Sequence, residues 1–253
     1  MRIAVLVLAA TLSLATAFAP SLVSQSGNAS QQGRKLLDQA IAALGGDAFL
    51  HLKTERLEGR IYGFRHERLS GFATVVEFVR FPGQERVEYG KKKEEIDIVS
   101  GDKIWSIDFH GVHPTPAEEA QAQLERRMMG AFHILRYRLN EPGSTVEYAG
   151  RERVDNREMD VVNFIDSDNR TVAIALDRSS HLPAQAVWNH RDPKTHDRIE
   201  EIESLSNYLT VQGVAAPRHL MRTRDGAKIF EAFIQAIQYN IELSDSLFVP
   251  KAP

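Results

Sequence analysis

The sequence contains no cysteine, and this absence removes several kinds of chemistry at once. Disulfide bonds, iron–sulfur clusters, thiolate–zinc sites and a cysteine nucleophile are all excluded. A lipid anchor carried by an N-terminal cysteine is excluded as well. A chain of 253 residues can bury most of its apolar surface without such cross-links, so its stability must come from packing.

A strong net charge and a catalytic motif are also missing. The formal net charge is −3 with both signs interspersed, so no basic field is present that would attract nucleic acid. No serine stands in the glycine-rich turn that presents the nucleophile of many hydrolases. We therefore expect a protein that is not an enzyme, with no catalytic residues and no cofactor.

One marked apolar run lies at the N-terminus. Arg2 precedes the run from Ile3 to Ala17, and Ala17-Phe18-Ala19 follows the pattern of a signal-peptidase site. A membrane-spanning helix needs about 20 apolar residues, and this run is shorter. We expect residues 1–19 to be a cleaved signal peptide, residues 20–33 a flexible leader, and residues 34–253 a single domain.

The next segments predict a short helix followed by strands. Leu37, Ala40, Ile41 and Leu44 have helical spacing, and Gly45-Gly46 would end that helix. From Glu55 onward, apolar and polar residues alternate with period two, which predicts strands over 55–63, 72–81, 84–91, 94–100 and 103–109. The second of these is apolar on both faces, so it is either central in a sheet or lines a cavity.

A helical pattern interrupts the strands near the middle of the chain. Thr115-Pro116 resembles a helix start, and an apolar stripe then continues to Asn140. At 1.5 Å per residue, this helix of about 24 residues would span roughly 36 Å and could cover a sheet. Strands resume at Thr145 and continue to the C-terminus, and Asp225-Gly226 is a typical hairpin turn. Residues 228–240 fit a strand and almost equally a helix; we predict a strand.

Several short motifs follow one another in an order that resembles a known family. They are Ala43 to Gly46, Gly90 to Trp105, Val154 to Glu158, Val161 to Phe164, Leu176 to Pro183, the series Tyr208, Val211, Gly213 and Pro217, and Asn240 to Phe248. Together they resemble the outer-membrane lipoprotein carrier and receptor superfamily, the LolA/LolB-like proteins, and in particular its uncharacterised exported members.

This resemblance implies a mainly β (α+β) fold: a half-open antiparallel β-barrel of about eleven strands, with an N-terminal helix and a long helical lid inserted midway. It implies a periplasmic carrier or chaperone that binds a lipid or acylated protein, in outer-membrane lipoprotein or lipid trafficking. The expected protein is a monomer that contacts membranes or membrane proteins transiently.

The residues expected to contact lipid share a place on the predicted central strands or on the predicted lid. They are Phe72, Val76, Phe78, Trp105, Ile107, Met128, Phe132 and Leu135. The methionines would offer an adaptable apolar surface. Periodicity alone is equally compatible with a filled core, and the protein would then be a structural or interaction module.

Two further alternatives concern histidine and arginine. His110 and His113 lack an identifiable third ligand, so we expect no metal site. A hydrolase with an unrecognised site would draw on His181, His190 or His196, which lie near predicted turns with aspartates close by. Arginines beside the apolar stripe of the predicted lid could meet anionic headgroups, although a solvated helix face explains them as well.

Overall fold

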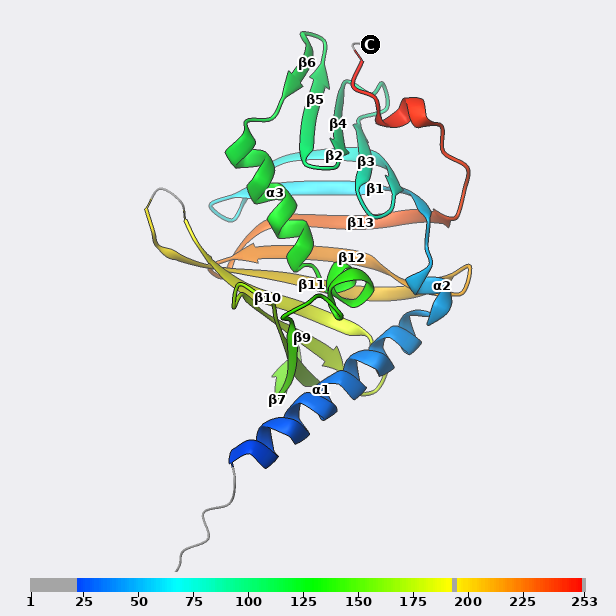
Figure 1. The fold of residues 1–253 in the computed structure, drawn as a ribbon. Helices are drawn as coiled ribbons and strands as arrows, with labels where there is room; N and C mark the ends of the chain where they lie inside the picture. Colours follow the sequence, from blue (N-terminus) through cyan, green and yellow to red (C-terminus); the bar gives the residue numbers. More distant parts are fainter. Residues whose placement is uncertain (1–21, 193–194, 252–253) are drawn as a thin grey trace, which may run out of the picture.

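The computed structural model describes residues 22–192 and 195–251, which form one large antiparallel sheet and a few helices (Figure 1). The predicted signal peptide, residues 1–19, lies outside the described residues. The strands are β1 (Thr54–Arg65), β2 (Arg68–Arg80), β3 (Gln84–Tyr89), β4 (Glu95–Ser100), β5 (Lys103–Asp108), β6 (Gly111–Pro114), β7 (Thr145–Val154), β8 (Arg157–Ile165), β9 (Thr171–Asp177), β10 (Pro183–Arg191), β11 (Arg198–Val211), β12 (Val214–Arg224) and β13 (Ala227–Tyr239). The helices are α1 (Leu22–Leu44), α2 (Asp47–Leu50), α3 (Ala117–Met129), α4 (Ala131–His133), the π-helix η1 (Ile134–Arg138) and the 3-10 helix η2 (Asp245–Phe248).

The sheet consists of two meanders joined in its middle. Its strand order is β6-β5-β4-β3-β2-β1-β13-β12-β11-β10-β9-β8-β7, so the first and the last strands of the chain pair with each other. Because β6 and β7 do not pair, the sheet is open. The prediction of a mainly β, antiparallel fold is confirmed, with thirteen strands in place of about eleven. The short strand β6 lies where no strand was predicted, and residues 228–240 form a strand as predicted.

Helix α1 is longer than the sequence predicted. It begins at Leu22 rather than Arg34 and runs through most of the segment 20–33 that was expected to be a flexible leader. Its packing explains the difference. A Cβ atom at Gly33 would lie 2.9 Å from the Tyr148 amide nitrogen, so the helix approaches β7 more closely than any larger residue allows. This contact stabilises helical structure in a segment of low apolar content.

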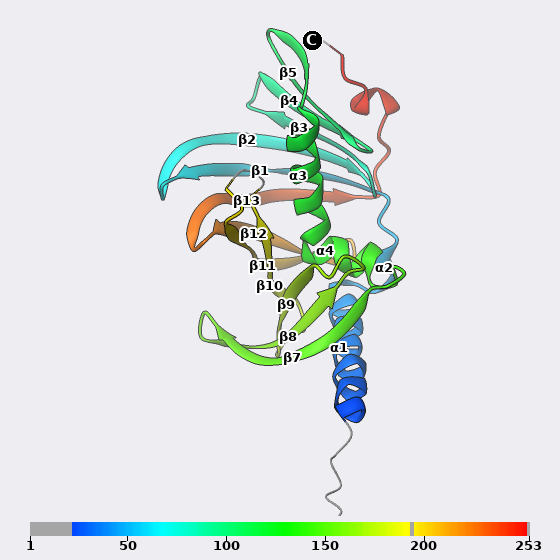
Figure 2. The ribbon, with the colours of Figure 1, turned by 60° about the vertical axis from the view of Figure 1, so that its left-hand side comes forward.

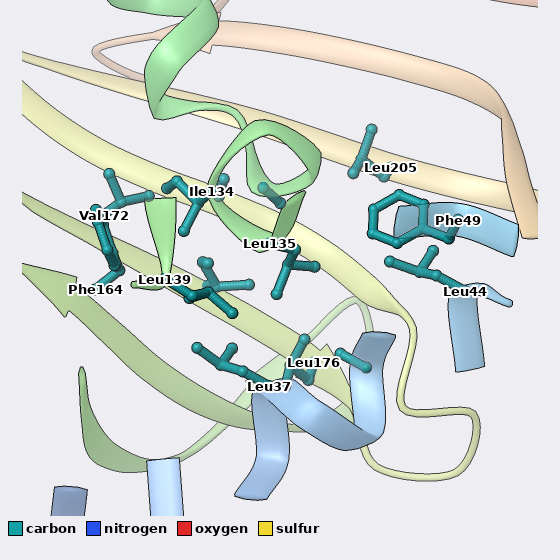
Figure 3. Close-up of a cluster of buried hydrophobic side chains, with 14 of the residues drawn as sticks. Leu37, Leu44, Phe49, Ile134, Leu135, Leu139, Phe164, Val172, Leu176 and Leu205 are labelled. Carbon is teal, nitrogen blue, oxygen red and sulfur yellow. The ribbon is translucent and has the colours of Figure 1, made fainter. Parts of the chain in front are cut away.

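The single helix predicted over 117–140 is broken at Gly130. Helix α3 begins after Pro116, and Gly130 leaves the helical conformation with φ −65° and ψ 140° before α4 and η1 follow. Glycine costs about 1 kcal/mol relative to alanine within a helix, so a break there is inexpensive. The break turns the chain, and Ile134, Leu135 and Leu139 enter the core beneath α1 (Figure 3).

Cross-strand register defines two faces of the sheet, because paired residues in an antiparallel sheet point to the same side. We call the face that α1, α3 and α4 contact the inner face, and the opposite one the outer face; η2 contacts the outer face at β3 and β4. On the half formed by β7–β11, which we call the sealed half, helices cover much of the inner face. Buried residues from both layers meet there, among them Leu37, Leu44, Ile134, Leu135, Phe164, Val172, Leu176 and Leu205.

A buried ion pair fixes the π-helix to the sheet. Arg138 Nη2 donates to Asp166 Oδ2 at 3.0 Å, and both residues are less than 5% exposed. Asp166 also accepts hydrogen bonds from the backbone and the guanidinium of Arg170. Burial opposes ionisation of Asp166, but these hydrogen bonds outweigh it and lower its pKa. The helical segment is therefore anchored at the turn between β8 and β9.

The two edge strands differ in length. Strand β6 has four residues, whereas β7 has ten and carries a β-bulge between Tyr148 and Gly150, where Gly150 has φ 108°. Strand β7 carries several exposed charged side chains on its two faces: Glu147, Arg151, Glu152 and Arg153. Of the helices in the described part of the chain, none combines the length and apolar character that crossing a bilayer requires.

Candidate functional site on the inner face beneath α3

Helix α3 crosses the inner face of the other half of the sheet (Figures 1 and 2). It contacts β5 near its N-terminal end, and α4 follows it directly in the chain. Ala120 and Leu124 pack there against Val99 and Ile104. In its last turn, two long side chains connect α3 to the sheet. Arg127 Nη2 lies 2.6 Å from Glu85 Oε2, and Arg126 Nε lies 3.1 Å from Glu201 Oε2.

The apolar residues that face α3 are less buried than those of the sealed half. The register places five apolar residues on the inner face of β1, β12 and β13, and each is half-buried: Leu57, Ile61, Leu220, Ile234 and Ile237. Leu220 and Ile237 border the core of the sealed half. By contrast, Val162, Phe164, Val172 and Ile174 on the sealed half have no exposed surface. Apolar surface thus remains available beneath α3.

Three carboxyl groups lie side by side on this face. Glu55, Glu77 and Glu85 belong to β1, β2 and β3, and the register through Leu57 and Val79 places all three on the inner face. Glu85 is paired with Arg127. Within the described residues, no basic nitrogen lies within 4.0 Å of the Glu55 or Glu77 carboxylates.

The surroundings of Glu55 and Glu77 favour their neutral forms. Burial raises the pKa of Glu55 to about 7; Arg136 opposes the shift and Glu85 adds to it. Burial together with the charges of Glu85 and Glu55 raises the pKa of Glu77 well above its usual value. Near neutral pH, these two carboxyl groups therefore carry less charge than exposed glutamates would.

Cationic groups approach from the helices. Arg136 on η1 donates from Nη2 to the Leu52 carbonyl oxygen at 2.7 Å, and its guanidinium lies over the Phe81 ring at 3.9 Å. Its Nε atom is buried and has no hydrogen-bond partner. Burial, with help from nearby arginines, lowers the pKa of His133 to about 4. The site thus places acidic groups on the sheet and arginines on the helices.

The eight residues predicted to contact lipid do not line one space. Register places Phe72, Val76, Phe78, Trp105 and Ile107 on the outer face. Phe72 is 75% exposed, and Trp105 and Ile107 pack in a small cluster with Ile96, Ile98 and Val112. The sequence correctly grouped Phe72, Val76 and Phe78 on one face. The sequence did not show which face of the sheet the helices would cover. The expectation that all eight residues line one cavity is therefore corrected.

The three predicted helical residues do lie on the inner side. Leu135 is fully packed in the core of the sealed half (Figure 3), Phe132 meets Phe49 edge-on with ring centroids 5.7 Å apart, and Met128 on α3 is half-buried. Contact of these residues with lipid stays a prediction. Two hollows in the described surface, one along the solvent side of α1 and one near β10 and β11, both lie outside the region beneath α3.

Sequence reasoning missed the three inner-face glutamates. The alternation of β1 contained the signal, because Glu55 shares its side with Leu57, but a charged residue at a strand start is ordinarily solvated. The histidines considered for hydrolysis stay apart: His181 and His196 lie in turns, and His190 faces Glu201. Nowhere in the described residues do three or more His, Asp or Glu side chains gather as a metal ion would require.

Comparison with known proteins identifies the fold. Neither a protein-family model nor a curated protein matches the sequence. Solved structures do match: a LolA superfamily protein from Nitrosomonas europaea is 10% identical with a TM-score of 0.56, over 86% of this chain and 97% of that one. The chain has the LolA-like fold.

Two further structures agree with the LolA-like fold. A domain from Vibrio parahaemolyticus, named for outer membrane lipoprotein sorting, is 10% identical with a TM-score of 0.58, covering 87% of this chain and 97% of that one. A DUF1329 family protein from Desulfovibrio piger is 12% identical with a TM-score of 0.61, covering 86% and 97%. The resemblance noted in the sequence is confirmed at the level of the fold, as one open sheet.

Proposed function

We propose that this protein is an exported, periplasmic carrier that binds a lipid or an acyl chain, free or attached to a protein, on the inner face beneath α3. The observation that supports the proposal is the set of half-buried apolar residues on this face, crossed by a helix that packs on the sheet at β5 and is otherwise joined to it by arginine–glutamate ion pairs. No chemical step takes place at this site. The carrier acts as a monomer and meets membranes transiently, when it loads or unloads.

The energetics of binding follow from the surface. Each methylene group that leaves water for an apolar surface contributes about 0.8 kcal/mol. An apolar chain lying against Glu55 and Glu77 meets carboxyl groups that take up a proton readily, so the cost of covering them is smaller than for ordinary carboxylates.

Movement of α3 would control access. The helix is held to the sheet by the Arg127–Glu85 and Arg126–Glu201 ion pairs. The partly exposed Arg127–Glu85 pair is worth only about 1 kcal/mol, whereas Glu201 is buried and keeps Arg224 and His190 as further partners when Arg126 leaves. We infer that α3 is the lid of the carrier and that breaking these pairs lets a ligand enter. A lid of this kind explains why the apolar residues below it are left incompletely packed.

The test uses two phenylalanines on opposite faces. Lipid that co-purifies is measured by native mass spectrometry and by organic extraction, and binding is measured with a fluorescent fatty acid. We expect Phe132→Glu to abolish binding and Phe72→Glu, on the outer face, to leave it unchanged. Ile61→Trp, which places a bulky side chain on the proposed binding surface, should weaken binding at least tenfold while the thermal midpoint is retained.

Two results would contradict the proposal. If the purified protein carries no lipid and ignores the fatty-acid probe, the chain is an interaction module with a filled core. If Phe72→Glu abolishes binding while Ile61→Trp has no effect, lipid binds to the outer face instead.

A further inference from the structure

Three side chains on adjacent strands form a continuous hydrogen-bonded chain on the outer face. Ser206 on β11 lies with its Oγ 3.0 Å from His219 Nδ1 on β12. On the other side of the ring, His219 Nε2 lies 2.8 Å from Glu231 Oε1 on β13. The register pairs Ser206 with His219 directly, so the sheet itself holds this geometry.

The hydrogen bonds decide the protonation of the imidazole. An ionised Glu231 is only an acceptor, so the neutral ring of His219 carries its proton on Nε2 and leaves Nδ1 unprotonated. Ser206 must then donate its hydroxyl proton to Nδ1. Burial opposes ionisation of Glu231, but hydrogen bonds from His219 and Lys228 prevail and lower its pKa. A hydroxyl that points at an unprotonated ring nitrogen, with a carboxylate behind the ring, is the arrangement that activates serine nucleophiles.

Two features of the surroundings indicate a ligand. A hollow of about 180 Å³ opens beside the serine and is lined by Ser206, Asn207, Tyr208, Leu182 and Pro183, among others. Asn207, the next residue after Ser206, has φ 56°, while Ser206 and Tyr208 on either side keep one register with β12. Non-glycine residues in this left-handed region are uncommon and cluster at functional sites.

A row of aromatic side chains begins at His219. The Phe233 ring stacks on His219 with centroids 4.7 Å apart, Tyr62 meets Phe233 edge-on at 5.9 Å, and Phe72 stacks on Tyr62 at 6.3 Å. Phe72 and Phe233 are 75% and 42% exposed, which is unusual for large aromatic residues that lie in a row. A ligand with an apolar part could lie along this row.

We propose that Ser206, His219 and Glu231 form an ester-hydrolysing site on the outer face, separate from the proposed carrier site. Its substrate is a carboxylic ester with a small acyl group, which enters the hollow, and an apolar alcohol part, which lies along the Phe233–Tyr62–Phe72 row. Ser206 is the nucleophile, His219 is the general base and acid, and Glu231 is a positioning residue that orients the ring.

The reaction proceeds in two balanced halves. The Ser206 oxygen attacks the carbonyl carbon as its proton passes to His219 Nδ1, and the bond to the alcohol oxygen breaks as that oxygen takes the proton. Water then attacks the acyl-serine, gives its proton to His219, and the returning proton regenerates the Ser206 hydroxyl. The net change is ester and water to carboxylic acid and alcohol.

Covalent labelling of the purified protein with a fluorophosphonate probe tests this site, with the labelled peptide identified by mass spectrometry. We expect label on Ser206 and slow hydrolysis of p-nitrophenyl acetate. Ser206→Ala should lose both. Ser204→Ala is the matched control, because Ser204 lies on the same strand and face but contacts Gln185 instead of a histidine. It should keep wild-type labelling.

Variants of the other two residues separate catalysis from structure. His219→Gln should slow labelling by about 100-fold. Glu231→Gln should lower kcat about tenfold with KM unchanged. His190→Gln is the histidine control, since His190 contacts Glu201 but no serine. Labelling that is absent from Ser206, or hydrolysis equal in Ser206→Ala and wild type, overturns the assignment. Either result is independent of lipid binding on the inner face.

Discussion

Replacing Glu55 with glutamine should change how the stability of the protein depends on pH. The pKa of Glu55 is about 7 in the folded protein and 4.5 in an unfolded chain, because the inner face beneath α3 desolvates the carboxylate. Between pH 4.5 and 7, the unfolded chain loses this proton while the folded protein keeps it, so folding becomes less favourable as pH rises. At 1.36 kcal/mol per pKa unit, the loss is about 3 kcal/mol by pH 8. Because a glutamine side chain has no proton to lose, the Glu55→Gln variant should not show this loss of stability.

The measurement is urea unfolding of wild type and Glu55→Gln at pH 5 and at pH 8. We expect the variant to gain about 2.5 kcal/mol relative to wild type between these two pH values, because the unfolded chain has already lost part of its proton at pH 5. Glu58→Gln, on the outer face of the same strand, is the control and should show a constant difference. A Glu55→Gln difference that stays constant within about 0.5 kcal/mol would refute the argument that burial keeps this carboxyl group protonated.

Three other substitutions test separate parts of the structure. Asp166→Ala leaves the buried Arg138 and the partly exposed Arg170 without this carboxylate and should cost about 3–5 kcal/mol in urea unfolding, more near neutral pH than in acid, where the carboxylate becomes protonated. Gly45→Ala should cost about 3 kcal/mol or more in stability, because φ is 124° and the new Cβ would lie 2.4 Å from a backbone oxygen. Gly46→Ala is the control, because its new Cβ meets open space, and it should cost only about 1 kcal/mol. Arg127→Gln removes the ion pair with Glu85, and it should leave stability within about 1 kcal/mol but release a fluorescent fatty acid about fivefold faster in stopped flow. An unchanged release rate would show that α3 does not act as the lid.

Local sequence signals predicted most of the strands correctly. Period-two alternation predicted the strands and the grouping of Phe72 with Val76 and Phe78, because alternation is a property of the extended backbone itself. It could not show which face the helices cover, since that depends on the turn at Gly130 and on packing between distant segments. The leader became helical for the same kind of reason, through the contact of Gly33 with β7.

The candidate sites were harder to predict than the fold. Glu55, Glu77 and Glu85 are brought together by strand register, and each alone looks like an ordinary solvated residue. Ser206, His219 and Glu231 come from three strands, and no local motif marks them. Their chemistry depends on two cross-strand hydrogen bonds that only the folded sheet provides.

The bulged, charged edge strand β7 has a consequence for solubility. An open sheet offers unpaired backbone groups on which strands of other molecules can assemble, and a long flat edge would act as a template for aggregation. The kink at Gly150 and the charges that follow it make continuous pairing with a second chain unfavourable, while β6 at the opposite edge is too short to recruit one. The protein can therefore keep its sheet open without polymerising through its edges.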